Sequence, residues 1–162
     1  MTTITASWLL SPPAQRALGL LTNAGHQAYF VGGCVRNALI GAGASDVDIA
    51  TSALPEDVIS LAEAAGIRAV PTGVEHGTVT LVIDGVGFEV TTFRRDVETD
   101  GRRAVVAFST DVIEDARRRD FTMNALYASA DGAVIDPLSG LADLTERRVR
   151  FIGEPRDRIR ED

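Results

Sequence analysis

Two aspartates one position apart, Asp46 and Asp48, could together bind a metal ion. Each is followed by an apolar residue, Val47 or Ile49, and this alternation is typical of a strand with both carboxylates on one face. Carboxylates about 4 Å apart repel by roughly 4 kcal/mol at an effective dielectric constant of about 20, and a cation between them removes that cost. Magnesium accepts such ligands together with substrate phosphates. We therefore expect a Mg2+ site, with two solvated acids on an exposed edge strand as the alternative.

Glu89 is a candidate for a third catalytic carboxylate. In the stretch FEVTTF it alternates with Thr91 and Phe93, so its side chain points to one face of a predicted hairpin. If that hairpin pairs beside the strand that carries the two aspartates, Glu89 joins their site. Otherwise it is a glutamate on the rim.

A glycine pair, Gly32 and Gly33, could hold a phosphate. It follows a short apolar run and precedes a short helical pattern, so free backbone N–H groups are expected at a helix start, where anions are favoured. Glycine allows the close approach that a phosphate needs. Arg36 lies one turn further and could reach the same anion. An ordinary Gly-Gly turn is the alternative.

The basic residues of the chain are all of one kind. All 16 are arginine, yet the net charge is −7 over 162 residues. The arginine fork suits phosphate groups, so local anion sites are compatible with the acidic total, and a GC-rich genome would explain the composition equally well. The negative charge excludes a generally basic nucleic-acid binder and predicts weak RNA binding by these residues alone.

The elements that position these residues follow a mixed α/β pattern in a chain of one-domain size. Helices are predicted over 11–25, 35–40, 55–66, 112–118 and 122–126, and strands over 28–31, 46–49 and 148–152. Two hairpins are predicted, one formed by TVTLVI and FEVTTF and one about Asp131–Gly132. The polar stretch 95–111 is expected to be a mobile loop, and the last residues, 154–162, to begin a helix.

The single cysteine bears on the compartment. Cys34 excludes an internal disulfide and fits a reducing cytoplasm, where it is expected to be a small core residue. No apolar run reaches the length of a membrane span, and the first residues lack the basic start of a signal peptide. We expect a soluble, cytoplasmic chain with no membrane partner.

Six motifs in order resemble the bacterial tRNA nucleotidyltransferases (CCA-adding enzymes) and their poly(A) polymerase relatives. They are VGGCVRNALIG, DVDIATSALPEDV, HGTVTLV, FEVTTFRRD, RRDFTMNALY and DPLSGLADL. The resemblance covers nearly the whole chain from Ala28 onward. It implies the polymerase-β-like nucleotidyltransferase head, an α+β fold with a mixed, mainly antiparallel sheet and flanking helices. It also implies a helical segment 1–27 packed on a head domain 28–152, with the start of a truncated helical neck at 153–162.

The same resemblance implies an activity, the transfer of nucleotides from CTP and ATP to the 3′ end of tRNA with two Mg2+ ions. Asp46 and Asp48 fall on the carboxylates that hold the metal ions. The segments that grip the incoming nucleotide correspond to Gly32, Gly33, Arg36, Arg118, Arg119, Asp120 and Asn124. Glu161 and Asp162 open a glutamate-aspartate-x-x-arginine motif that reads the bases, and Asp136 and Asp143 lie in a segment thought to flex between additions.

The sequence departs from the family pattern at three points. Asn37 stands where aspartate is usual, so no carboxylate role is assigned there, and Ser139 replaces a common glycine and is expected to stiffen its turn. The printed chain stops at Asp162, within the base-reading motif, and is expected to be a catalytic head whose neck, body and tail follow in relatives.

Other interpretations of these motifs stay open. The head motifs do not separate CCA addition from poly(A) addition, and a non-catalytic nucleotide-binding module is a further alternative. The arginines of RRDF also fit a solvated helix face with Glu114–Arg118 and Asp115–Arg119 ion pairs. A dinucleotide-binding domain is set aside because the third glycine of its fingerprint is missing.

Overall fold

The computed structural model describes residues 2–42, 46–99, 103–119, 122–140 and 142. Within these ranges the helices are α1 Pro12–Thr22, α2 Gly33–Ile40, α3 Pro55–Ala64 and α4 Val112–Arg117, with 3-10 turns η1 Val74–His76 and η2 Thr122–Asn124. The strands are β1 Ala28–Val31, β2 Asp48–Thr51, β3 Arg68–Gly73, β4 Thr78–Ile83, β5 Val86–Thr92, β6 Arg94–Thr99, β7 Arg103–Phe108, β8 Tyr127–Ala128 and β9 Val134–Ile135.

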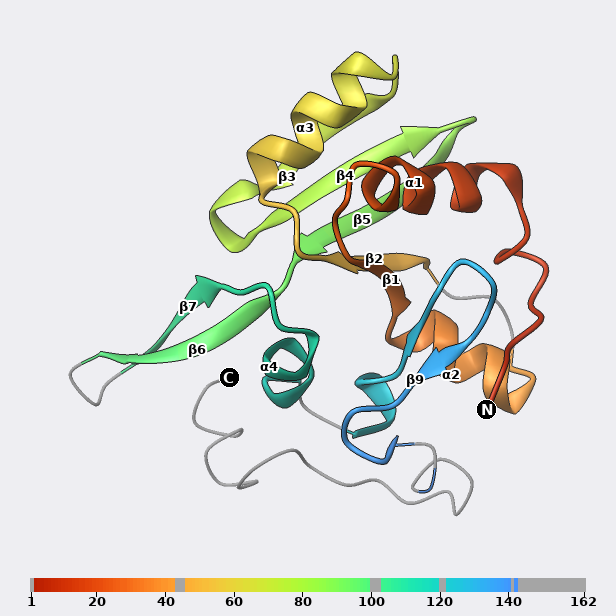
Figure 1. Ribbon diagram of the computed structural model, residues 1–162, viewed down its shortest axis with the longest axis vertical. Helices are drawn as coiled ribbons and strands as arrows, with labels where there is room; N and C mark the ends of the chain where they lie inside the picture. Colours follow the sequence, from red (N-terminus) through yellow and green to blue (C-terminus); the bar gives the residue numbers. More distant parts are fainter. Residues whose placement is uncertain (1, 43–45, 100–102, 120–121, 141, 143–162) are drawn as a thin grey trace.

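One mixed sheet organises the described part of the chain (Figure 1). Its strand order is β3-β4-β5-β2-β1-β8-β9. The neighbours β2 and β5 run parallel, and the other neighbouring pairs run antiparallel. The mainly antiparallel sheet with flanking helices that the sequence predicted is therefore confirmed.

The alternation of side chains along β1 and β2 divides the core into two layers. Phe30 and Ile49 belong to the larger apolar cluster, whereas their neighbours Val31 and Ala50 belong to a smaller cluster on the opposite face. Helices α1 and α3 cover the larger cluster, and Figure 1 shows them on the same side of the sheet. The smaller cluster includes Ala116 of α4, so α4 lies over the other face.

The N-terminal residues are hydrogen-bonded to the edge of the sheet at the β8–β9 hairpin. Ile4 N–H donates to Gly132 O at 2.9 Å and Val134 N–H donates to Thr2 O at 2.9 Å, on either side of a bridge between Thr3 and Ala133. The hairpin predicted about Asp131–Gly132 is confirmed as β8–β9. Residues 2–4 therefore lie against the β8–β9 hairpin at the edge of the sheet before the chain enters α1.

The prediction of a loop over 95–111 was wrong. Strands β6 and β7 pair antiparallel from Arg94–Phe108 to Thr99–Arg103 and extend away from the main sheet (Figure 1). A two-stranded ribbon is held by main-chain hydrogen bonds between its own strands, so the charged residues that favoured a loop do not prevent it. Strand β3 was not predicted, and the strand over 148–152 and the helix after it fall outside the described residues.

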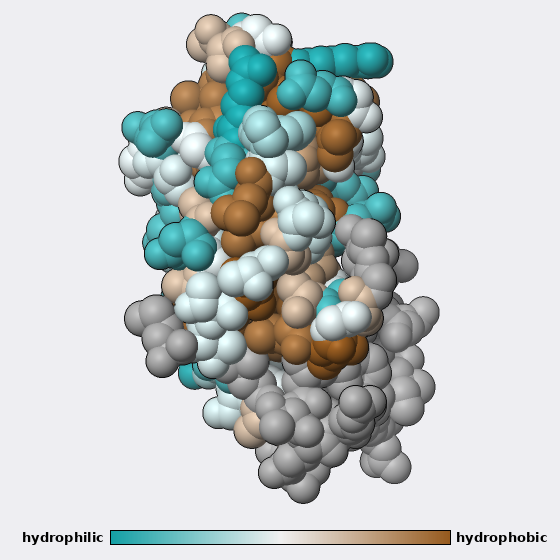
Figure 2. All heavy atoms as spheres, turned by 90° about the vertical axis from the view of Figure 1, so that its right-hand side faces the viewer, coloured by the Kyte–Doolittle hydropathy of each residue, from teal (hydrophilic) through white to brown (hydrophobic). Residues whose placement is uncertain are grey.

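Exposed apolar side chains do not form one continuous surface on the face shown in Figure 2, where apolar areas are interrupted by polar residues. Among the described residues, the large exposed apolar side chains come from separate parts of the chain and are Leu10, Ile40, Leu54, Val86, Phe108 and Ile113. Within the described residues, no helix is long and apolar enough to cross a membrane.

Candidate functional site

One cavity gathers residues from four separate parts of the chain. Its volume is about 400 Å³. The lining residues come from the start and first turn of α2, the first residue of β2, the end of α4 and η2, and are Gly32, Gly33, Arg36, Asp48, Arg118, Arg119 and Asn124. All of them had been put forward from the sequence motifs, and the fold brings them together.

The turn before α2 depends on glycine. Gly32 has φ 83° and ψ −135°, a backbone conformation that residues with a Cβ rarely adopt. Its N–H donates to Leu126 O at 3.2 Å, which fixes the turn against the segment before β8. The first-turn N–H groups of a helix lack intrahelical acceptors, so a helix start at Gly33 beside the cavity favours an anion there.

Arg36 is held beside this turn by two neutral oxygens. Its Nη1 donates to Asn124 Oδ1 at 2.8 Å, and its Nε donates to Asn37 Oδ1 at 3.1 Å. A carboxamide oxygen accepts a hydrogen bond without cancelling the guanidinium charge. The two contacts therefore orient Arg36 and leave its positive charge to act on a ligand in the cavity.

Asp48 begins β2 and lies in register with Glu89 on the parallel neighbour β5. Of the two alternatives that the sequence left open for Glu89, the structure shows the one in which its hairpin pairs beside the strand that carries Asp48. Asp48 is half-buried, and Glu89 is exposed. Burial raises the pKa of Asp48 to about 6, with a further contribution from the charge of Glu89 and a smaller one from Asp46, against the opposing effect of Arg119.

Asp46 does not belong to the strand as predicted. Strand β2 begins at Asp48, so Asp46 lies in the segment before it and its side chain is exposed. Strand alternation therefore does not place the two carboxylates on one face. The charge of Asp46 still contributes to the raised pKa of Asp48, as the smallest of its causes.

The donor set fits a hard divalent cation. Within the described residues, no three His, Cys, Asp or Glu side chains are gathered closely enough to hold a metal ion by themselves. Mg2+ needs only one or two carboxylates and completes its shell with waters and substrate phosphates. Asp48 and its register partner Glu89 carry oxygens of this kind, and a cation would relieve the repulsion that, in addition to burial, raises the pKa of Asp48.

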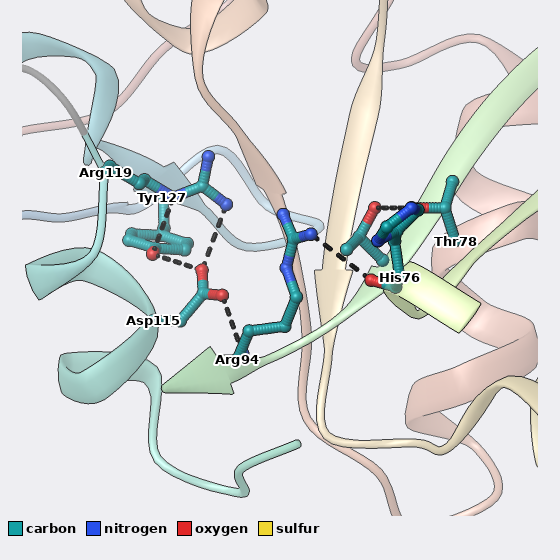
Figure 3. A network of polar contacts seen from close by, with 7 residues as sticks. His76, Thr78, Arg94, Asp115, Arg119 and Tyr127 are labelled. Atoms are coloured by element: carbon teal, nitrogen blue, oxygen red, sulfur yellow. Dashed lines mark hydrogen bonds and ion pairs between the residues drawn. The ribbon is translucent and has the colours of Figure 1, made fainter. Parts of the chain in front are cut away.

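Arg119 enters the cavity from the end of α4 and is fixed by a hydrogen-bonded network (Figure 3). The predicted pair of Arg119 with Asp115 is present, with Nη2 3.0 Å from Oδ2. The Tyr127 hydroxyl also takes part in the network, and sequence reasoning gave it no role. Among the ion pairs between described residues there is none between Glu114 and Arg118, and Glu114 accepts a hydrogen bond from Ser109 Oγ at 2.8 Å.

The other predicted residues lie elsewhere or outside the description. Asp136 Oδ1 accepts from Gly140 N–H at 2.7 Å and closes a turn. In that turn Ser139 has a positive φ of 61°, a conformation that glycine adopts more easily.

Cys34 is buried, which raises the pKa of its thiol to about 11, and the expected core role is confirmed. Asp120, Asp143, Glu161 and Asp162 fall outside the described residues.

The sheet and the cavity together define a class of protein. Strand β2 places Asp48 beside a Gly-Gly helix start and the arginines of α2 and of the end of α4, and the parallel neighbour β5 carries Glu89 in register with Asp48. This is the head of the polymerase-β-like nucleotidyltransferases. Within that class, the family model described as the poly A polymerase head domain matches residues 28–150, and the chain belongs to this family.

Curated relatives narrow the comparison further. The chain is 48% identical over 151 residues to the CCA-adding enzyme of Levilactobacillus brevis. The alignment covers 92% of this chain and 37% of that protein. It is 44% identical over 158 residues to the CCA-adding enzyme of Geobacillus stearothermophilus, with coverages of 94% and 38%. The chain thus spans less than two fifths of the length of these relatives.

Solved structures agree with the sequence comparison. The crystal structure of the Bacillus stearothermophilus CCA-adding enzyme in complex with CTP superposes with a TM-score of 0.80 at 44% identity, over 94% of this chain and 37% of that one. A tRNA nucleotidyltransferase complexed with a primer tRNA and an incoming ATP analog superposes with a TM-score of 0.66 at 31% identity, over 85% of this chain and 39% of that one.

Proposed function

We propose that this chain is the catalytic head of a CCA-adding enzyme and transfers nucleotides from CTP and ATP to the 3′ end of tRNA. The observation that carries the proposal is that the Gly-Gly turn, three arginines and Asp48 line one and the same cavity. The resemblance to enzymes named for this activity, one of them solved with CTP, supports the choice of substrates.

Different residues of the cavity would bind different parts of a nucleoside triphosphate or supply charge to it. The backbone at Gly32 and Gly33 admits phosphate oxygens close to the start of α2, where the helix dipole favours negative charge. The guanidinium groups of Arg36, Arg118 and Arg119 supply positive charge from two sides of the same space. Phosphoryl and nucleotidyl transfer depend mainly on such positioning and charge stabilisation.

The carboxylates would hold the metal ions. Asp46 and Asp48 are the proposed ligands, with Glu89 as the neighbour in register with Asp48. Two Mg2+ ions are expected, and when bound they would lower the pKa of an attacking hydroxyl and stabilise the leaving phosphates. Asp48 lies in the wall of the cavity, so a metal ion bound to its oxygens would lie beside a triphosphate held in the same cavity.

The test is a calorimetric titration of the chain with CTP, ATP, GTP and UTP, each with and without Mg2+. The Asp48→Asn variant is titrated alongside the unmodified chain. Asp84→Asn is the control, since it makes the same change at an exposed β4–β5 turn remote in sequence from the cavity residues. We expect binding of nucleotide that depends on Mg2+ and is lost in Asp48→Asn only; binding without any effect of Mg2+ would contradict the metal site.

Poly(A) addition is a second candidate, because the matching family model carries the name of that activity. The two are separated by giving a longer form of the protein CTP, ATP and a tRNA that lacks its CCA end. A product extended by three residues only when both nucleotides are present supports CCA addition. A long tail made from ATP alone would contradict CCA addition and support poly(A) addition.

A further inference from the structure

We infer that Asp115 and Tyr127 are positioning residues that hold Arg119 in the orientation needed to bind the triphosphate. The inference rests on the proposed function, because it concerns a ligand of the same cavity. Neither residue lines that cavity, and both act through a side chain that does.

Asp115, Tyr127 and Arg119 form a closed ring of hydrogen bonds (Figure 3). Arg119 Nη2 donates to Asp115 Oδ2 at 3.0 Å, and Arg119 Nε donates to the Tyr127 hydroxyl at 3.2 Å. The same hydroxyl donates to Asp115 Oδ2 at 2.7 Å. Because each member contacts the other two, a displacement of Arg119 breaks two hydrogen bonds at once.

The two supporting side chains are themselves fixed. Asp115 is only 2% exposed, and its other oxygen accepts the backbone N–H of Arg94 at 3.1 Å, at the first residue of β6. Tyr127 is fully buried, and its ring packs edge-on against Tyr29 at 6.1 Å between centroids. Burial raises the pKa of Tyr127, so its hydroxyl keeps the proton that it donates to Asp115.

Arg119 retains donors for a ligand. Its side chain is 23% exposed and lines the cavity, and its contacts within the described residues use Nε and Nη2. The Nη1 amino group therefore remains to donate to a phosphate oxygen. A long arginine side chain that is already ordered loses less conformational entropy when the ligand binds, which favours affinity.

Asp115 has two opposing effects on ligand binding. It orders Arg119, which strengthens binding, and it cancels part of the positive charge, which weakens attraction for an anion. If the positioning effect dominates, Asp115→Asn weakens nucleotide binding. If the charge effect dominates, the same variant binds more tightly, and that result would overturn the inference.

Tyr127→Phe is the sharper variant, because it removes one hydroxyl and keeps the buried ring. Tyr29→Phe is its matched control, since Tyr29 belongs to the same aromatic group and its hydroxyl makes no hydrogen bond within the described residues. The unmodified chain and both variants are titrated with CTP and Mg2+ by calorimetry. We expect Tyr127→Phe to weaken binding about threefold to tenfold and Tyr29→Phe to leave it unchanged.

A double-mutant cycle separates positioning from a general structural effect. In the Arg119→Ala background, Tyr127→Phe should cause no further loss, because the side chain through which it acts is gone. A loss of the same size in both backgrounds would overturn the inference, as would equal binding by Tyr127→Phe and Tyr29→Phe. If the unmodified chain binds no nucleotide, that result contradicts the proposed function itself and also removes the basis of the inference.

Discussion

Asp48 and Glu89 occupy the same register position on the parallel neighbours β2 and β5. Two acidic residues side by side in a sheet destabilise it unless one is protonated or a cation lies between them. In the absence of metal, burial and the charge of Glu89 raise the pKa of Asp48 to about 6. The strand pairing thus carries an electrostatic cost that a metal ion would remove.

The first prediction concerns the pH dependence of stability without metal. The folded chain holds the Asp48 proton up to about pH 6, whereas the ordinary pKa of this group is 3.8, so the folded state binds more protons between these values. Stability therefore falls as pH rises through this window and stays lower above it. Asp48→Asn removes the effect, so it should raise the melting temperature more at about pH 7.5 than at about pH 4.5.

Thermal unfolding in EDTA measures this difference, with Asp84→Asn as the exposed control. Adding Mg2+ at the higher pH should stabilise the unmodified chain and leave Asp48→Asn unchanged, because only the former keeps the carboxylate. An equal gain from Asp48→Asn at both pH values would show that the pKa of Asp48 is not raised.

The second prediction concerns the neutral partner of Arg36. Asn124→Asp would place a carboxylate 2.8 Å from Arg36 Nη1, where a carboxamide oxygen now accepts the hydrogen bond. The new charge pairs with Arg36 and repels phosphates in the cavity, so CTP affinity should fall about tenfold. Asn23→Asp makes the same change at the exposed C-terminal end of α1 and serves as the control in the calorimetric titration. Equal affinities of the two variants would exclude Arg36 and Asn124 from the binding site.

Local pattern was enough to predict much of the fold and the lining of the cavity. The strand Ala28–Val31 and the Gly-Gly helix start were recognised because apolar runs and glycines act within a few residues. The pairing of Glu89 with Asp48 joins residues 41 positions apart, and the sequence offered it only as one alternative. The β6–β7 ribbon forms through main-chain pairing, and it was missed because the charged composition of that stretch is typical of a loop.

The supporting residues of the site were harder to foresee than its lining. Asp115 had an i, i+4 relation to Arg119, which suggested an ion pair on a solvated helix face. Only the fold shows that Asp115 is buried and that Tyr127, from strand β8, completes the ring. A contact that depends on two separate elements leaves no periodic signal in either of them.

The third prediction separates the two glycines before and at the start of α2. Gly32→Ala has space for its Cβ, so its only cost is the backbone conformation at φ 83°, about 1–3 kcal/mol of unfolding free energy. Gly33 is the first residue of the helix and does not have a positive φ, so Gly33→Ala should carry no such backbone strain. Chemical denaturation of both variants measures the difference. Equal stability of the two would show that the turn does not require the Gly32 conformation.

The fourth prediction concerns the attachment of the N-terminal residues to the β8–β9 turn. Gly132 and Gly85 both lie in hairpin turns with positive φ, 88° and 78°, so alanine is strained at each. At Gly132 the added Cβ would also collide with the Ile4 carbonyl oxygen and lie 3.2 Å from Leu9 Cδ2, whereas nothing lies within 4 Å at Gly85. Gly132→Ala should therefore lower the free energy of unfolding by about 2 kcal/mol more than Gly85→Ala, because backbone atoms must move. Denaturant titration of both variants tests this, and equal losses would mean that the N-terminal residues do not pack against this turn in solution.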